Sequence, residues 1–301
     1  ECIEEFIVEK KRGGRKPHSY INEYKDYRPK LSLLTEILGD QPVNDITKAD
    51  IVEYKNTLFR MPSNRNKKPI YLGRTIEQLR EMDIPHQDLL SNTTVSNHFV
   101  KIASFLAWLS ENDFAESNLS SPLRRVIKKD RPDSELRSEF TDNDLNALFN
   151  NDYYFKGKHR HHSHYWIPLL ALFTGARLNE LCQLDKTDIV EIDGIWCIDI
   201  NRKDRKRLKS LSSERLIPIH PILINDLYFL KFVDSKKTIK LFPELRESPV
   251  GFGQSFSKWF NRTYRKNVGV GQSQRTRKDF HSFRHTFANS FKQMESIQEY
   301  R

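Results

Sequence analysis

The chain has 301 residues, of which 37% are hydrophobic and 30% are charged. That length accommodates about two domains and a sizeable core, so it excludes a collagen-like chain, a short disulfide scaffold and a lone small module. Lys and Arg number 50 against 40 Asp and Glu, and the formal net charge of +10 favours a polyanionic partner, with nucleic acid ahead of an acidic membrane surface.

Cysteine usage and hydropathy narrow the cellular setting. Cys2, Cys182 and Cys197 form an odd set without CxxC spacing, which indicates neither a disulfide framework nor a zinc ribbon. We expect a reducing, cytoplasmic setting, nucleoid-associated if the source is bacterial, with Cys182 and Cys197 as core thiols. The longest apolar run, Trp166 to Phe173, is far shorter than the roughly 20 residues that cross a bilayer, so we expect neither a transmembrane helix nor a membrane partner.

The amino-terminal third carries short helical patterns. Residues 1–19 are charged and are predicted to be a lead-in, and their start lacks an initiator Met and a signal pattern, which suggests a longer gene product. The apolar residues between positions 31 and 38 fit an amphipathic helix closed by Gly39, and Thr47 with Asp50 starts another. Residues 61–75 hold two prolines and a basic cluster, which predicts an exposed, positive loop.

A longer helix is predicted from Ser91 to Leu109, where apolar residues recur at helical spacing. Asn97 and Lys101 lie on its other face, which is either a solvated face or one that meets DNA, and both interpretations stay open. Residues 20–123 are therefore predicted to form a helical domain. Residues 124–137 are basic, contain proline and lack periodicity, which predicts a linker; a surface loop within one domain is the alternative.

Residues 138–301 are predicted to form a second domain. Thr141 caps its first helix, and Trp166 to Leu184 is predicted as one continuous helix. Ile189 to Ile200 alternates through an Asp-Gly turn signal, and Arg215 to Ile219 makes a third strand. Further helices are predicted over residues 221–232, 253–264 and 280–300. The fold class is therefore mainly α with a small antiparallel β-sheet.

Arg177 is the first candidate for chemistry. It follows a glycine inside an apolar segment, and an arginine in such surroundings needs a partner or an anion to bind. Glu180 stands three residues on, a spacing that lets its carboxylate steady the guanidinium. Taken alone, this pair is more often a buried structural ion pair than an anion site.

Two further basic features follow along the chain. The segment from Arg202 to Lys209 has six basic residues in eight positions, which is typical of a solvated loop or a nonspecific phosphate contact, although a lysine at its inner end could reach a phosphate held by the sheet. His281 and Arg284 are predicted on one face of a helix, near its start. The positive end of a helix and a guanidinium fork both favour an anion.

In this order, an arginine, a lysine beside a β-hairpin and a His-x-x-Arg pair, the sequence resembles the tyrosine recombinase (phage integrase) family. The matching motifs are Thr174-Gly-Ala-Arg177-Leu-Asn-Glu180-Leu, Lys209 with Arg215-Leu-Ile-Pro, and His281-Ser-Phe-Arg284-His285-Thr-Phe-Ala. The resemblance covers roughly residues 20–300. It implies a SAM-like core-binding domain over residues 20–123 and an α+β catalytic domain over residues 138–301.

The resemblance implies a site-specific recombinase that cuts and rejoins DNA through a 3′-phosphotyrosine, as in DNA integration by mobile genetic elements. Arg177 and Arg284 would hold the scissile phosphate. Lys209 would protonate the leaving 5′ oxygen, and His281 would assist proton transfer at the attacking tyrosine. The supporting residues would be Glu180 and His285. Double-stranded DNA is the implied partner, with a homotetramer on DNA for the full-length protein and no cofactor, metal or small-molecule substrate.

The lysine is the least settled of these residues. Lys203 and Lys206 compete with Lys209, which is favoured because it lies six residues before Arg215 and is followed by a serine. The candidates for contact with DNA are Asn97, Lys101, Arg202, Lys203, Arg205, Lys206 and Arg207.

The sequence departs from the family pattern after the second motif. It stops 17 residues after Arg284, whereas the family places its nucleophilic tyrosine well beyond that arginine. On an unbroken helix Tyr300 would lie roughly 24 Å from Arg284 along the axis, too far for attack on the same phosphate. We therefore expect a carboxyl-terminally truncated recombinase that is monomeric without DNA, binds DNA and lacks complete catalysis, with no nucleophile in this chain.

Other interpretations stay open. A noncatalytic DNA-binding regulator could keep a recombinase scaffold, and a type IB topoisomerase shares the same basic residues while relaxing supercoils. The segment from His159 to His164 has four histidines in six positions but lacks a thiolate or a carboxylate set, so a polar lead-in to the next helix is favoured over a metal site.

Overall fold

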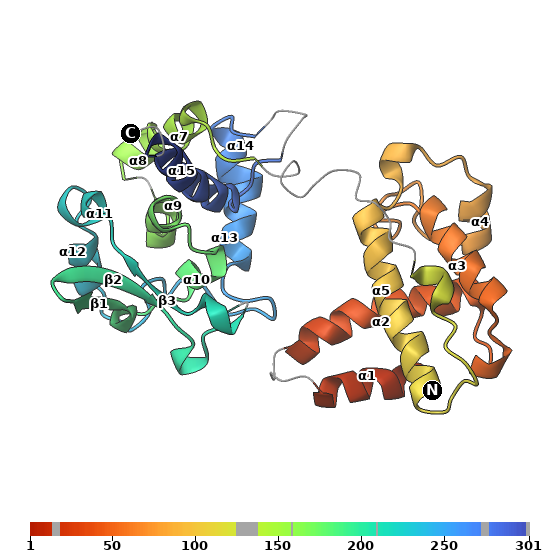
Figure 1. Ribbon diagram of the computed structural model, residues 1–301. Coiled ribbons are helices and arrows are strands. Elements are labelled where there is room, and N and C mark those ends of the chain that lie inside the picture. Colours follow the sequence, from red (N-terminus) through yellow and green to blue (C-terminus); the bar gives the residue numbers. More distant parts are fainter. Residues whose placement is uncertain (14–18, 125–137, 158, 209, 272–276, 299–301) are drawn as a thin grey trace. The chain divides into compact units, whose positions relative to one another are not determined.

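The computed structural model describes the chain except residues 14–18, 125–137, 158, 209, 272–276 and 299–301 (Figure 1). The chain forms two compact units, Glu1–Asp130 and Arg131–Arg301. Within the described residues, none of the helices combines the length and apolar character needed to cross a membrane.

The first unit is built from helices. They are α1 (Cys2–Gly13), α2 (Ser19–Leu38), α3 (Lys48–Arg60), α4 (Ile76–Glu81) and α5 (Asn92–Glu111), with short 3₁₀ turns η1 (Val43–Asp45), η2 (His86–Asp88) and η3 (Ser121–Leu123). Thr47 and Asp50 form the expected capping box at the start of α3, and the Ser91 hydroxyl accepts from the Thr94 amide at the start of α5. Both predicted helix starts are confirmed.

The first helix belongs to this unit's core, which corrects the expectation of a lead-in over residues 1–19. The Phe6 side chain is fully buried, and its ring lies 5.2 Å from that of Tyr27 and 5.4 Å from that of Trp108. The α2 helix also runs through Pro29, so it begins well before the helix expected over residues 31–38. Leu31 continues the buried stripe of Tyr27, and this burial outweighs the one backbone donor that proline lacks.

The loop over residues 61–75 is only partly the exposed, positive loop that the sequence predicts. Tyr71 is buried, and its hydroxyl donates to Asp88 Oδ2 over 2.7 Å. Lys68 pairs with the same carboxylate. Ile70 and Leu72 are exposed beside them. An aromatic anchor therefore holds this loop against η2.

The second unit is mixed. Its helices are α7 (Asp142–Phe149), α8 (Asp152–Phe155), α9 (His162–Thr174), α10 (Leu178–Cys182), α11 (Pro221–Asn225), α12 (Phe229–Asp234), α13 (Gln254–Trp259), the π-helix η7 (Phe260–Tyr264), α14 (Arg265–Asn267) and α15 (Ser282–Gln298). Its strands are β1 (Ile189–Ile192), β2 (Ile195–Ile200) and β3 (Arg215–Pro218). The predicted fold class, mainly α with a small antiparallel sheet, is confirmed.

The sheet has the order β1-β2-β3 with both pairs antiparallel. Asp193 and Gly194 both have positive φ, 50° and 77°, which is the backbone that a two-residue hairpin turn requires. In the register, Ile198 pairs with Ile189 on one side and Ile217 on the other, so one face of all three strands points into the core.

The predicted helix from Trp166 to Leu184 is wrong, because the chain breaks at Gly175. This glycine has φ 58°, ends α9 with a hydrogen bond from its amide to Ala171, and leaves an extended residue before α10. A Cβ at position 175 would lie 2.4 Å from Phe287 Cδ1, so only glycine fits without a shift. Arg177 consequently lies at the N-cap of α10 and not within a long helix.

The histidine-rich segment enters the aromatic core. The His164 ring stacks on Trp259 at 3.6 Å between centroids, and its Nδ1 lies 3.3 Å from the Tyr153 hydroxyl. Tyr264 also stacks on Trp259, at 5.1 Å. Across the described residues, histidine, cysteine and carboxylate side chains form no group that could hold a metal ion.

Candidate functional site

Arg177 and Glu180 form the centre of the site. Arg177 Nη1 donates to Glu180 Oε1 over 2.7 Å, and the Arg177 backbone amide donates to Oε2 over 2.9 Å. The Glu180 side chain is only 2% exposed. Burial alone would raise the pKa of Glu180, but hydrogen bonds from Arg215 and Arg177 lower it overall, so the carboxylate is ionised. The Arg177–Glu180 pair predicted from the spacing is present, but Arg177 caps the start of α10 and does not lie on the face of a longer helix.

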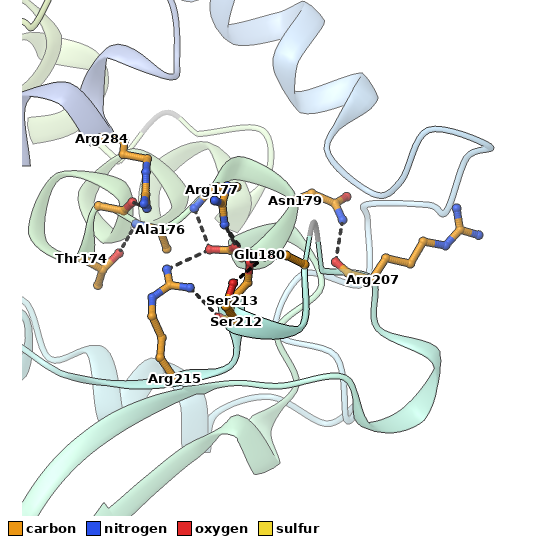
Figure 2. Close-up of polar contacts among 12 residues, drawn as sticks. Thr174, Ala176, Arg177, Asn179, Glu180, Arg207, Ser212, Ser213, Arg215 and Arg284 are labelled. Atoms are coloured by element: carbon orange, nitrogen blue, oxygen red, sulfur yellow. Dashed lines mark hydrogen bonds and ion pairs between the residues drawn. The ribbon is translucent and has the colours of Figure 1, made fainter. Parts of the chain in front are cut away.

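Arg215 is a site residue that sequence reasoning missed. Its Nη2 donates to Glu180 Oε2 over 2.9 Å, and its Nη1 donates to the Ser213 carbonyl over 2.8 Å. The Ser213 hydroxyl lies 3.2 Å from Arg177 Nη1. Figure 2 shows Arg215 reaching Glu180 from the strand side. A charged residue at the start of a short strand is the signal that was present, but only the fold shows where it points.

Arg284 reaches the same place from α15. Its Nη1 donates to the Gly175 carbonyl over 2.6 Å, and Figure 2 shows it beside Thr174 and Ala176, next to Arg177. Burial lowers the pKa of Arg284, and the positive charges of Arg177 and Arg215 lower it further. The site is thus electropositive, because Arg177 and Arg215 share the Glu180 carboxylate and Arg284 adds a third positive charge nearby.

His281 and His285 stand at the start of α15. His281 precedes the helix by one residue and donates its backbone amide to Asp279 Oδ1 over 2.9 Å, so it lies in the entry turn and not on the predicted helix face. The two imidazole rings are 5.2 Å apart, edge to face. Arg284 lies between them in sequence, and the motif is therefore gathered at one helix end.

Lys206 is an internal anchor, which corrects its prediction as a contact to DNA. Its Nζ lies 2.6 Å from Asp188 Oδ1 and 2.9 Å from Asp185 Oδ2, and its side chain is 3% exposed. Burial would lower the pKa of Lys206, but the two carboxylates raise it overall, so the ammonium is charged. A buried ammonium with two partners cannot reach a DNA backbone.

The other basic residues of this loop are paired near the surface. Lys203 Nζ lies 3.3 Å from Asp199, with 72% of its side chain exposed, and Arg202 pairs with Glu214 over 2.5 Å. Arg207 pairs with Glu247, and its backbone amide and carbonyl both bind Gln183 at the C-cap of α10. The Arg205 side chain and the whole of Lys209 lie outside the described residues.

The two helical candidates of the first unit differ in exposure. Asn97 is exposed on α5. Lys101 is half-buried, with its Nζ 3.0 Å from Asp26 Oδ2 and 4.1 Å from the Tyr27 ring centre. Lys101 therefore has a structural role in joining α5 to α2.

The tyrosines described in the second unit are held in other contacts. The Tyr264 hydroxyl donates to the Leu148 carbonyl, and burial raises the pKa of Tyr264 to about 12. Tyr154 is partly buried, with its hydroxyl 3.2 Å from the Tyr165 carbonyl. Tyr300, which was rejected as nucleophile from its spacing, lies outside the described residues.

Comparison with known proteins places this fold. A family model described as the phage integrase family matches residues 139–298, more than half of the chain. A search of the curated proteins found no match.

Solved structures agree in fold. A lambda integrase dimer bound to a COC′ core site matches with a TM-score of 0.62 and 16% identity, covering 97% of this chain and 86% of that chain. A variant of the Tn1549 transposon integrase in complex with a circular intermediate DNA matches with a TM-score of 0.61 and 17% identity, covering 97% of this chain and 86% of that chain. A lambda integrase tetramer bound to a Holliday junction matches with a TM-score of 0.61 and 16% identity, covering 97% of this chain and 72% of that chain. On the match to its family model, the chain belongs to the phage integrase family, the tyrosine recombinases.

Proposed function

We propose that this protein is a site-specific DNA recombinase whose second unit binds the scissile phosphodiester between Arg177 and Arg284. The observation that carries the proposal is their convergence beside one buried carboxylate, Glu180, which leaves the site with excess positive charge. A phosphodiester brings the negative charge that this arrangement lacks. Guanidinium groups also match the geometry of phosphate oxygens.

The arginines would act by fixed electrostatics. As a nucleophile attacks phosphorus, negative charge grows on the nonbridging oxygens, and preoriented donors stabilise that charge without reorganising. Glu180 holds Arg177 in place, and the Gly175 carbonyl holds Arg284. Both guanidiniums are therefore oriented before DNA arrives.

Proton transfer would use Lys209 and His281. In the proposed step a tyrosine hydroxyl attacks phosphorus, the bond to the 5′ oxygen breaks, Lys209 protonates that oxygen, and His281 assists removal of the tyrosine proton. One phosphate ester replaces another, so the reaction needs no external energy source. Lys209 is preferred because the two alternative lysines already have carboxylate partners. Lys206 is buried between two carboxylates, and Lys203 pairs with Asp199.

The nucleophile is assigned to none of the described tyrosines. Tyr153, Tyr154, Tyr165 and Tyr264 pack in one aromatic cluster, and Tyr228 lies between α11 and α12 under the Lys231 ammonium. We propose that the described residues bind and orient DNA, and that cleavage requires a tyrosine from outside them. Double-stranded DNA is the proposed partner, with a homotetramer as the working assembly, the state in which lambda integrase is seen on a Holliday junction.

Phosphate binding can be tested with this chain directly. A duplex selected from a random library by binding to the chain serves as ligand, and fluorescence anisotropy gives its affinity across a salt series. Arg177→Ala and Arg284→Ala are each expected to weaken binding about 10-fold or more and to reduce the slope of log K against log salt by about 0.9. The control is Arg80→Ala in the first unit, which removes an arginine paired with Glu53. Unchanged slopes in both site variants would overturn the proposal.

The chemistry is tested by trapping. The full-length protein is mixed with a nicked duplex, and covalent adducts are resolved on a denaturing gel. A tyrosine-linked adduct that disappears in Arg177→Ala supports the recombinase. Sequence-specific binding without any adduct would indicate a regulator, and supercoil relaxation without strand exchange would indicate a topoisomerase; either result overturns the recombinase assignment.

A further inference from the structure

Arg215 is committed to protein partners on both of its terminal nitrogens. Nη2 donates to Glu180 Oε2 over 2.9 Å, and Nη1 donates to the Ser213 carbonyl over 2.8 Å. About 30% of the side chain is exposed, so it borders the site without being free to turn into it. A guanidinium used at both ends is poorly suited to grip a second anion.

The contacts of Arg215 close a ring with Arg177. Arg177 Nη1 donates both to Glu180 Oε1, over 2.7 Å, and to the Ser213 hydroxyl, over 3.2 Å. Arg215 binds the other oxygen of the same carboxylate and the carbonyl of the same serine. The side chains of Arg177, Glu180 and Arg215 thus form one hydrogen-bonded loop that is closed by the hydroxyl and carbonyl of a single serine at the end of η6 (Leu211–Ser213) (Figure 2).

The two arginines differ in the rigidity of their supports. Arg215 pairs with Ile200 across the β2–β3 register, and Ile200 is buried in the core. Arg177 instead caps a helix of five residues that follows the Gly175 break. Strands position side chains more precisely than turns do. Arg215, on the sheet, is therefore the support, and Arg177, at the turn, is the residue that it holds in place.

Charge explains why such a support is needed. Arg177, Arg215 and Arg284 are like charges gathered around Glu180, and the pKa of Arg284 is lowered, after burial, by the other two arginines. Mutual repulsion would push an unrestrained Arg177 toward solvent. Two acceptors in fixed places, the Glu180 carboxylate and the Ser213 hydroxyl, oppose that movement.

We propose that Arg215 is a positioning residue that fixes the Arg177 guanidinium through Glu180 and Ser213 and does not itself bind the DNA phosphate. This inference rests on the proposed function of Arg177 as the phosphate ligand. Arg215 would then influence the affinity for DNA only through its effect on Arg177.

A double-mutant cycle tests that dependence. Arg215→Lys keeps the charge but loses the planar fork that spans Glu180 and Ser213. It is expected to weaken DNA binding about 5- to 20-fold in the otherwise unchanged chain, and less than about twofold when Arg177 is already alanine. The same fold loss in both backgrounds would overturn the inference, because Arg215 would then act independently of Arg177.

The salt dependence supplies a readout that separates positioning from direct contact. Arg215→Gln is expected to change the slope of log K against log salt by much less than the 0.9 or so lost with a phosphate contact. A loss as large as that of Arg177→Ala would make Arg215 a phosphate ligand and contradict the proposal. The control is Arg80→Gln, since Arg80 also donates to two partners, Glu53 and Thr57, and should keep its DNA affinity within about twofold.

Ser213→Ala keeps the experiment decisive if an Arg215 variant does not fold. It leaves the carbonyl that Arg215 uses and removes only the hydroxyl that Arg177 contacts. We expect weaker DNA binding by about two- to fivefold, again only while Arg177 is present. If instead Arg177→Ala and Arg284→Ala leave DNA binding unchanged, the proposed function fails; if they weaken it while Arg215→Lys and Ser213→Ala act additively, only this inference fails.

Discussion

Arg284 donates a hydrogen bond from Nη1 to the carbonyl of Gly175 over 2.6 Å, although 109 residues separate the two. Gly175 is also the residue at which α9 ends, and Phe287 of α15 packs against the face where a side chain would stand. One residue therefore sets the path of the chain toward Arg177 and receives the second arginine. The spacing between the two candidate phosphate ligands depends on it.

Gly175→Ala should destabilise the second unit by about 2 to 4 kcal/mol, because the new Cβ would lie 2.4 Å from Phe287 Cδ1 and the backbone has φ 58°. Urea unfolding followed by tryptophan fluorescence measures the loss. Gly194→Ala is the control, since Gly194 also has positive φ but has open space around it, and it should cost about 1 kcal/mol. Equal losses in the two variants would contradict the packing argument.

Lys206→Met should reduce the free energy of unfolding by about 3 to 5 kcal/mol, because it leaves Asp188 buried without a cation and leaves Asp185 with Lys240 alone. Lys203→Met is the matched control on the same loop, and its exposed pair with Asp199 should make a difference of at most about 0.5 kcal/mol. Chemical denaturation gives both values. A Lys206 variant of unchanged stability that binds DNA less well would restore Lys206 as a DNA contact.

His164→Phe should flatten the pH dependence of stability between about pH 6.5 and pH 4. Burial, with the nearby His161, lowers the pKa of His164 from 6.5 to about 4, so the folded state holds it neutral. The contribution of His164 to the free energy of unfolding is complete above pH 6.5. It is lost as the pH falls toward 4, because the unfolded chain binds the proton at a higher pH than the folded chain does. That contribution amounts to roughly 3 kcal/mol, and phenylalanine keeps the stack on Trp259.

Thermal or urea unfolding over that pH range measures the slope for each protein. The exposed His86 provides the control, and His86→Phe should leave the slope as it is. If His164→Phe retained the full slope, the loss of stability on acidification would have to come from other groups.

Phe6→Ala should destabilise the first unit by about 3 to 5 kcal/mol, because its ring is fully buried among Tyr27, Phe105 and Trp108. Val8→Ala on the same helix removes a side chain that is 43% exposed and should cost less than about 1 kcal/mol. Urea unfolding compares the two. A small effect at Phe6 would restore the interpretation of α1 as a detachable lead-in.

The sequence predicts those features of the fold that depend on local chemistry. The caps at Thr47, Ser91 and Thr141 and the Asp-Gly hairpin are all present, because each depends on neighbours within a few residues. The family could also be inferred from three short motifs and their order. The contact between Arg177 and Glu180 follows from their spacing alone.

The remaining features depend on residues that are distant in the sequence. The break at Gly175 is not predicted because a single glycine is tolerated in a helix, and the packing of Phe287, which leaves no room for a Cβ, comes from a distant part of the sequence. Lys206 and Lys203 look alike in a basic run, and the carboxylates that bind Lys206 come from the turn just before β1. The sequence places Arg215 in a family motif at the start of a strand but gives it no role, since its contact with Glu180 appears only when β3 pairs with β2.

The buried Glu180 carboxylate gives the site its own counter-ion. Arg177 and Arg215 both bind it before any DNA arrives, so their mutual repulsion is partly offset while the site keeps its excess positive charge. Incoming DNA therefore meets guanidiniums that are already held in place. Small free anions, which would lack the many other contacts of a nucleic acid, should in turn compete poorly for this position.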